Sequence, residues 1–459
     1  MQKKKNIDFQ LVLTIVLTMV LSGCESFLSE KSDKSLGTPS TIEDFEALLN
    51  DWGVLNSTFS SLGDASSDDL YLTTEDYNGL HYESDKRLYT WQPDYVSRSV
   101  ASAGNEWAHC YNAIYVCNAV LDGLEKNGLK GYETDKLKGQ ALTFRAARYL
   151  DGVQIWSPVY RQETADVELG MVIRLDPDVN IISARATVGE TYSQIIKDLE
   201  EALPLLPLTS VSPALPTKAA AHGLLARVYL VIGDYAESLR HAEESLKYNE
   251  ELIDFNGLSV EASFPIPVVN QMSKEIIFFT RMYSSEIVNN LNIARVSSSL
   301  YELYKQGDLR RDIYFRKDNA GNFYFKGTHM GHRGLITGIT TSELMLIIAE
   351  CNVRLKKLSD GAFVLNKLLV KRWDNGHFVP YTFENTKDAL TIVLEERRKE
   401  LLFRGLRWGD LKRFNRDGAE ITLTRIIGDT YTLQPNDKRY AIAIPEDIVD
   451  ISRVKQNPR

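Results

Sequence analysis

Cysteine is scarce in this chain, whose 459 residues include only Cys24, Cys110, Cys117 and Cys351. If Cys110 and Cys117 share one helix, their seven-residue spacing separates the Cα atoms by about 10 Å, which is beyond the reach of a disulfide. We therefore expect no disulfide framework, and we expect burial in a large core to stabilise the fold instead.

The chain also lacks a net positive charge and long hydrophobic runs. The formal net charge of −9 argues against non-specific nucleic-acid binding, because such binding needs a basic surface that neutralises phosphates. The apolar run at 11–21 is shorter than the ~20 residues that a transmembrane helix needs, and no second run approaches that length. The sequence contains no Walker loop, dinucleotide fingerprint or nucleophile elbow.

The first two dozen residues are typical of an export signal. Three lysines at positions 3–5 precede the apolar run at 11–21, and Leu21-Ser22-Gly23-Cys24 follows it. This ending resembles the bacterial lipobox, in which the cysteine is acylated (palmitate) and becomes the new N-terminus. The alternative is an ordinary signal peptide with an accidental cysteine. We predict a signal peptide at 1–23, lipidation at Cys24 and a lipid-anchored tether at 24–40.

Helical periodicity dominates much of the remaining sequence. Thr187 and Glu190 have the spacing of a capping box in front of a helix that Pro204 ends. Residues 218–248 predict two helices broken at 233–235, with small residues where packed helices cross, and this spacing resembles a tetratricopeptide repeat. The other predicted helices span 106–124, 134–156, 342–357, 361–373 and 386–414.

Two blocks, 53–104 and 251–340, lack a sustained helical period and indicate short strands and long loops. Long irregular segments in a helical chain are usually functional. We therefore predict a mainly α fold, in which a tetratricopeptide-like helical scaffold (approximately 106–250 and 341–416) carries a loop-rich, short-strand ligand-binding face. We expect residues 41–459 to form a single domain.

Several segments resemble the SusD/RagB family of outer-membrane nutrient-binding lipoproteins of Bacteroidetes-type bacteria. Glu395-Glu396-Arg397-Arg398-Lys399-Glu400 followed by Gly405-Leu406-Arg407-Trp408-Gly409-Asp410 is the most specific match. One departure is visible, since the family's Arg-Tyr-Ala-Glu-type helix start is replaced by Thr341-Ser342-Glu343. The other similar segments, in the family's order, are 24–28, 145–156, 187–206, 218–235, 444–446 and 455–458.

The resemblance implies a surface-exposed lipoprotein of the cell outer membrane that is not an enzyme. Such proteins capture an oligomeric nutrient, usually a glycan, and deliver it to a SusC-like TonB-dependent transporter. A peptide-binding lid of the same type is one alternative. A surface glycan hydrolase, suggested by acids in the loops, and a tetratricopeptide-type module that binds only a protein partner are two others.

Sugar binding without catalysis needs aromatic faces and short polar side chains. Trp91 stands in the loop-rich N-terminal block, whereas the other five tryptophans lie on helical patterns, where core packing is expected. We predict that Trp91 binds ligand, and the alternative is that it packs into the scaffold beneath the loops. The other candidate ligand-binding residues are Tyr89, Tyr95, Tyr77, His81, Tyr82, Asp68, Asp69, Asn78, Tyr283 and Tyr324.

No cofactor and no metal are expected. His329 and His332 are a weak metal signal because no third ligand is near in sequence. The basic run at 397–407 is accompanied by acids, and pairs four residues apart (Glu395 with Lys399, Glu400 with Arg404) predict a salt-bridged structural helix. Nucleic acid is therefore not an expected partner.

Overall fold

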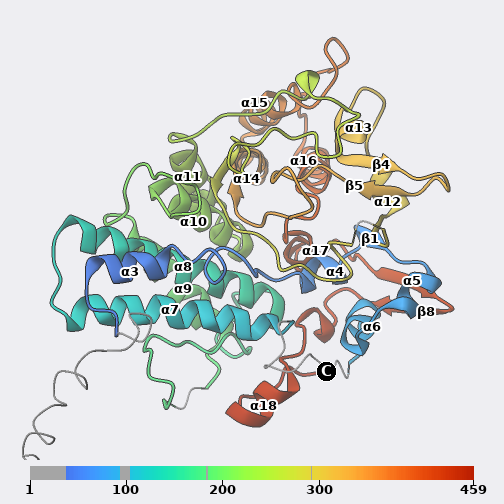
Figure 1. The fold of residues 1–459 in the computed structure, drawn as a ribbon. Coiled ribbons are helices and arrows are strands. Elements are labelled where there is room, and N and C mark those ends of the chain that lie inside the picture. The colour runs from blue at the N-terminus through green and yellow to red at the C-terminus, as the bar shows by residue number, and fades with distance from the viewer. Residues whose placement is uncertain (1–37, 94–103, 182–183, 291) are drawn as a thin grey trace, which may run out of the picture.

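The computed structural model describes residues 38–93, 104–181, 184–290 and 292–459 (Figure 1). The predicted signal peptide, Cys24, most of the tether and Tyr95 lie outside these described residues. Within them, none of the helices combines the length and the apolar character needed to cross a membrane.

Helices form the bulk of the described chain, as predicted. In Figure 1, α3, α7, α8 and α9 lie together at the lower left, and α14, α15 and α16 lie above them, next to α10 and α11. The long helices are α3 (Ile42–Leu49), α7 (Glu106–Lys126), α8 (Tyr132–Trp156), α9 (Val188–Ala202), α10 (Lys218–Ile232), α11 (Tyr235–Leu246), α14 (Thr341–Arg354), α15 (Leu358–Leu369), α16 (Thr386–Glu400) and α17 (Arg407–Arg416).

Local sequence signals set several of these helix ends. The Thr187 hydroxyl accepts the Glu190 N–H at 3.1 Å, and the Glu190 carboxylate accepts the Thr187 N–H at 2.8 Å, so the predicted capping box is confirmed. The predicted break between α10 and α11 is also confirmed, and Gly233 occupies it with a φ of 94°.

Small residues allow α10 and α11 to pack closely. The Ser238 hydroxyl donates to the Ala226 carbonyl at 2.8 Å, and the Ser245 hydroxyl donates to the Ala219 carbonyl at 2.7 Å. Because these donors come from one helix and the acceptors from the other, the backbones must lie near each other. The tetratricopeptide-like spacing of this segment thus corresponds to a packed helix pair.

The predicted helix at 386–414 is wrong in one respect, because it is two helices. The chain leaves α16 after Glu400 and enters α17 at Arg407, with positive φ at Phe403 (55°) and Gly405 (71°). Between them the buried Arg404 donates to the carbonyls of Ile336 (3.1 Å) and Gly338 (2.7 Å). These bonds to a distant segment stabilise a turn that the local sequence does not predict.

The pairs predicted within that segment are also wrong. Lys399 contacts Asp308 (3.3 Å) and Glu396 (2.6 Å) instead of Glu395. Glu400 pairs with Arg310 (3.2 Å) and Arg372 (2.8 Å) instead of Arg404. This face of α16 is buried, so its charges pair with other segments, and replacing one partner of such a buried cluster typically costs about 3–5 kcal/mol.

Within the described residues, the strands form four two-stranded antiparallel sheets. These are β1 (Leu70–Tyr71) with β3 (Arg295–Val296), β2 (Ile276–Phe278) with β6 (Ile339–Thr340), β4 (Phe315–Lys317) with β5 (Phe323–Phe325), and β7 (Leu423–Ile427) with β8 (Asp429–Leu433). The short helices are α4 (Leu62–Ser66), α5 (Thr74–Gly79), α6 (Glu83–Tyr89), α12 (Ser298–Tyr301), α13 (Arg310–Tyr314) and α18 (Glu446–Ser452), and single 3₁₀ turns lie at Phe255–Gly257 and Lys438–Tyr440.

The two loop-rich blocks meet on one side of the helices, at the right of Figure 1. Strand β1 of the first block pairs with β3 of the second, with Leu70 opposite Val296. An Arg295–Asp76 ion pair and a hydrogen bond from the Tyr71 hydroxyl to Asn322 (3.1 Å) add to this contact. The prediction of a mainly helical fold with a loop-rich, short-strand face is confirmed.

Candidate functional site

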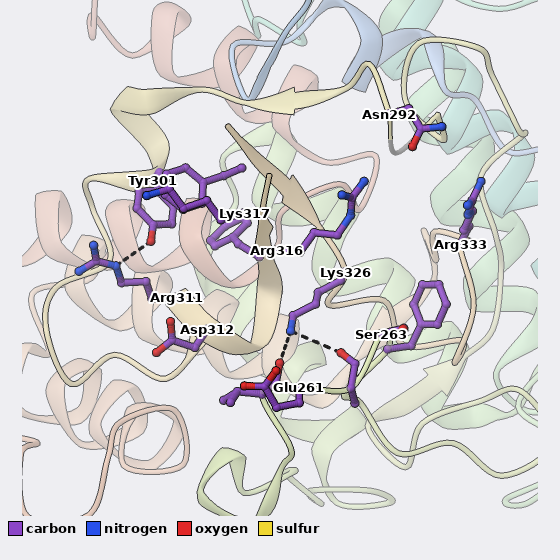
Figure 2. Close-up of a pocket in the computed structure, with 15 residues that line it drawn as sticks. Glu261, Ser263, Asn292, Tyr301, Arg311, Asp312, Arg316, Lys317, Lys326 and Arg333 are labelled. Atoms are coloured by element: carbon purple, nitrogen blue, oxygen red, sulfur yellow. Dashed lines mark hydrogen bonds between the residues drawn. The ribbon is translucent and has the colours of Figure 1, made fainter. Parts of the chain in front are cut away.

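The loop-rich face contains a pocket of about 800 Å³ (Figure 2). Its walls come from the loop at 260–264, from α12 and α13, from the β4–β5 hairpin and from Arg333. This size falls in the range of small-molecule sites, which occupy about 300–1,000 Å³. All of these walls belong to the predicted block at 251–340.

Aromatic rings form one wall of the pocket. Tyr301 at the end of α12 stacks on Phe323 of β5, with ring centroids 3.5 Å apart and planes 15° apart. Phe315 of β4 meets Tyr301 edge-on at 5.5 Å. The strand register places Phe323 opposite Lys317 and Phe315 opposite Phe325, so the hairpin presents rings and a cation to the same region. Such aromatic surfaces suit the apolar side of a sugar ring.

Charged side chains complete the lining, as the sticks in Figure 2 show. The Arg311 guanidinium donates to the Tyr301 hydroxyl at 2.8 Å. The buried Lys326 ammonium donates to the carbonyls of Val260 and Ala262, and burial lowers the pKa of Lys326. The pocket also contains the cations Arg316, Lys317 and Arg333 and the acids Glu261 and Asp312.

The structure places Trp91 and Tyr89 in the core. The Trp91 ring is 5% exposed and its Nε1 donates to the Ser66 carbonyl at 3.0 Å, while the Tyr89 hydroxyl accepts the Leu72 N–H at 2.7 Å. The Arg425 guanidinium of β7 lies over both rings, 3.5 Å from the Tyr89 centroid and 4.8 Å from that of Trp91. This burial favours the scaffold role for Trp91 that the sequence leaves open.

Asp68 and Asp69 link the N-terminal block to the C-terminal helices. Asp68 pairs with Arg407 (2.8 Å) and Arg398 (3.0 Å), and Asp69 pairs with Arg398 (2.8 Å). Burial alone would raise the pKa of Asp68, but the two guanidiniums hold it below its ordinary value. Both carboxylates therefore have a structural role, and the arginines that they pair with belong to the predicted salt-bridged segment.

The remaining predicted residues of the first block do not line the pocket. Asn78, His81 and Tyr82 are exposed, and His81 contacts Glu286 of the other block at 3.3 Å. Tyr77 is half-buried, with its ring 6.0 Å from that of Tyr89.

Tyr324 and Tyr283 come from the second block. Tyr324 is buried behind the hairpin, where its hydroxyl donates to Asp318 (3.0 Å) and the Arg316 guanidinium lies 4.4 Å from its ring. Tyr283 is half-buried, with its ring 5.4 Å from that of His109. Neither ring lines the pocket. Sequence reasoning selected this block but missed Tyr301, Phe323 and the cations.

His329 and His332 do not share a site. His329 is buried and its Nδ1 lies 2.8 Å from the Ser273 hydroxyl, whereas Nδ1 of His332 accepts the Gly334 N–H at 3.0 Å. Over the described part of the chain, no cluster of three or more His, Cys, Asp or Glu side chains could hold a metal ion. Cys110, Cys117 and Cys351 are buried and form no disulfide.

Comparison with solved structures identifies the class of fold. A putative sugar-binding protein from Bacteroides vulgatus ATCC 8482 matches with a TM-score of 0.71 and 22% identity over 92% of this chain and 99% of its own. A SusD superfamily protein from Bacteroides thetaiotaomicron VPI-5482 matches with a TM-score of 0.71 and 20% identity over 91% of this chain and all of its own (100%). The fold is therefore that of SusD superfamily proteins.

Sequence comparison identifies the family. A family model described as "Starch-binding associating with outer membrane" matches residues 26–230, and the SusD family model matches residues 328–453. SusD-like protein P2 of Formosa agariphila is 23% identical over 365 residues, which cover 67% of this chain and 70% of the relative. The chain belongs to the SusD/RagB family, and this membership supports a nutrient-binding role.

Proposed function

We propose that this protein is a lipid-anchored lipoprotein on the surface of the outer membrane that captures an oligosaccharide in the 800 Å³ pocket. It then delivers the oligosaccharide to a partner SusC-like TonB-dependent transporter and breaks no bond itself. The observation that carries the proposal is the Tyr301–Phe323 stack beside polar and charged groups, all on the loop-rich face. Family membership supports both the nutrient-binding role and the location.

Asp68 and Asp69, two of the loop acids that suggested a hydrolase, have structural partners. Asp69 is buried and paired with Arg398. A glycosidase needs two carboxyl groups placed about 5–9.5 Å apart across a cleft. The ion pairs of Asp68 and Asp69 therefore argue against a catalytic role for these two carboxylates.

A binding screen tests the proposed site. The full chain, purified in mild detergent, is titrated with a panel of oligosaccharides and a matched panel of peptides. Tyr301→Ala removes half of the stacked pair and should weaken binding of the recognised glycan about tenfold or more, because truncating a central aromatic anchor often costs about 2 kcal/mol. Tyr132→Ala, at an exposed position of α8 outside both loop-rich blocks, is the matched control and should keep the affinity.

The results discriminate between the alternatives. Binding of peptides but no glycan would move the protein to the peptide-binding branch. Glycan binding that survives Tyr301→Ala, in a variant whose melting temperature is unchanged, would place the site elsewhere on the face. Consistent failure to copurify with a large outer-membrane barrel in mild detergent would contradict the transporter partnership.

A further inference from the structure

The pocket has a charge opposite to that of the chain. The whole sequence has a formal net charge of −9, but five cations and two acids line this pocket. A recess with cations along low-dielectric walls concentrates the electric field and attracts anions. The excess of cations over acids is therefore found in the pocket, where it would attract an anionic ligand.

Four of these cations, Arg311, Lys317, Lys326 and Arg333, form no ion pair with a carboxylate of the described residues. The described contacts of Arg311 and Lys326 go to a hydroxyl and to carbonyls. Elsewhere in the described chain, buried Arg310, Arg372 and Arg413 pair with acids at 2.5–3.2 Å. Buried Lys412 and Arg425 donate to carbonyls, as Lys326 does, but they do not line this pocket.

Lys326 is the most deeply placed of these cations. It is 7% exposed, yet its ammonium has only carbonyl partners, those of Val260 and Ala262. An ammonium has three donors, so one remains available, and Figure 2 shows the group between the hairpin and the 260–264 loop. Glu261 and Asp312 attract this charge without forming an ion pair with it, and a bound anion would supply a direct partner.

Two of the cations, Arg311 and Lys317, lie close to the aromatic rings of the pocket. The Arg311 guanidinium lies 5.0 Å from the Tyr301 ring centroid, and the Lys317 ammonium lies 5.6 Å from that of Phe323. A ligand resting on this wall therefore meets apolar surface and positive charge within one side-chain length. An acidic sugar has this combination, since its ring carries C–H groups and its substituent carries a carboxylate or sulfate.

We propose that the pocket selects an acidic oligosaccharide, with sugar rings along Tyr301 and Phe323 and carboxylates or sulfates at Arg311, Lys317 and Lys326. This inference rests on the proposed function, because it assumes that the pocket holds a glycan. An acidic peptide offers the same charge but does not need the aromatic wall, so it is an outcome of the test.

The test compares four probes of equal length: an oligogalacturonate, a sulfated galactan oligosaccharide, a neutral galactan oligosaccharide and a peptide of aspartate and glutamate. The full chain in mild detergent is titrated calorimetrically at low and high salt. We expect one of the acidic oligosaccharides to bind at least about tenfold more tightly than the neutral probe, with an affinity that falls as salt rises. Tighter binding of the oligogalacturonate would indicate a carboxylated ligand, and tighter binding of the sulfated galactan would indicate a sulfated one.

Two lysine variants test whether the preference for acidic probes comes from the cations of the pocket. Lys317→Gln removes one exposed cation from the pocket and should lower the affinity for the acidic probe about fivefold while leaving the melting temperature unchanged. Lys197→Gln, an exposed lysine on α9, changes the net charge equally and should leave the affinity unchanged.

Three outcomes would overturn the inference. A neutral probe that binds as tightly as both acidic oligosaccharides, with loss of binding in Tyr301→Ala, would remove the charge selection and keep the proposed function. Binding of acidic peptides without acidic sugars would assign the pocket to peptides. Absence of binding to every glycan would overturn both proposals together.

Discussion

At the residue scale, Glu106 connects the N-terminal block to the scaffold. It lies in the first turn of α7, where its carboxylate accepts hydrogen bonds from the Ser60 hydroxyl (2.6 Å) and from the N–H (2.9 Å) and hydroxyl (2.5 Å) of Ser61. Burial raises the pKa of Glu106 to about 7 in spite of these bonds. Its charge is therefore a cost to the folded state near neutral pH.

The sign of the resulting pH dependence follows from this shift. The folded state binds the Glu106 proton more tightly than the unfolded chain does, so the stability from this group is complete below pH 4.5 and falls as the pH rises toward 7. Glu106→Gln does not ionise. We expect urea unfolding at pH 5, 6 and 7 to show a loss of stability that is about 1–3 kcal/mol larger in the native protein than in this variant.

Two controls support that measurement. Burial also raises the pKa of Asp64 to about 7 and that of Asp151 to about 6, and both groups remain in the variant. The difference between the two slopes of stability against pH therefore reports Glu106 together with its repulsion of Asp151. Glu243→Gln, at an exposed position of α11, should leave the slope as it is in the native protein. Equal slopes in all three proteins would show that Glu106 is ionised in the fold at pH 5.

At the element scale, the α10–α11 turn depends on one glycine. Gly233 has a φ of 94° and donates its N–H to the Tyr229 carbonyl at 3.0 Å. A Cβ added there would meet only the Tyr235 hydroxyl, at 4.0 Å, so crowding is not the obstacle. The cost of a side chain at this position is backbone strain alone.

Gly233→Ala should therefore lower the free energy of unfolding by about 1 kcal/mol. Chemical denaturation measures the change. Gly257→Ala is the matched control, because Gly257 has no positive φ and open space around its Cβ position, and we expect it to change stability by less than about 0.5 kcal/mol. An equal effect in the two variants would mean that the turn does not impose the strain.

Helix boundaries were predictable where the signal is local. Thr187 and Glu190 are three residues apart and contact each other, and Gly233 lies at the break itself. The end of α16 was not predictable, because Arg404 is stabilised by carbonyls of Ile336 and Gly338, more than sixty residues away in sequence. Interactions of that range have no signature in the residues that surround the turn.

The candidate site also has one part that the sequence predicted and one part that it did not. The irregular composition of 251–340 predicted a functional face, and the pocket lies there. Trp91 was the preferred ligand contact, but Arg425 of β7 and the Ser66 carbonyl enclose it in the core. Because burial depends on which distant strand covers a loop, the sequence could not rank Trp91 below Tyr301 or Phe323.

At the scale of the whole molecule, the pocket is formed from one block but its surroundings come from both. Strands β1 and β3 join the blocks, and Arg295 pairs with Asp76. Arg310 of the second block pairs with Glu400 of α16, and Arg372 pairs with both Glu400 and Glu275 of the second block. This strand pairing and these ion pairs hold the loop-rich face against the helical scaffold. A surface held in this way would suit the proposed capture of a ligand in one orientation.

The proposed attachment to the membrane rests on Cys24, which lies outside the described residues. If Cys24 is acylated, the intact mass of the native protein should include acyl chains and lack residues 1–23, and Cys24→Ala should lose the acyl mass and move into the soluble fraction. The reason is that each buried CH₂ of an acyl chain contributes about 0.8 kcal/mol to membrane binding. Ser26→Ala keeps the cysteine and should remain membrane-bound. A Cys24→Ala protein with residues 1–23 removed that stayed on membranes after a high-salt wash would contradict a lipid anchor at this position.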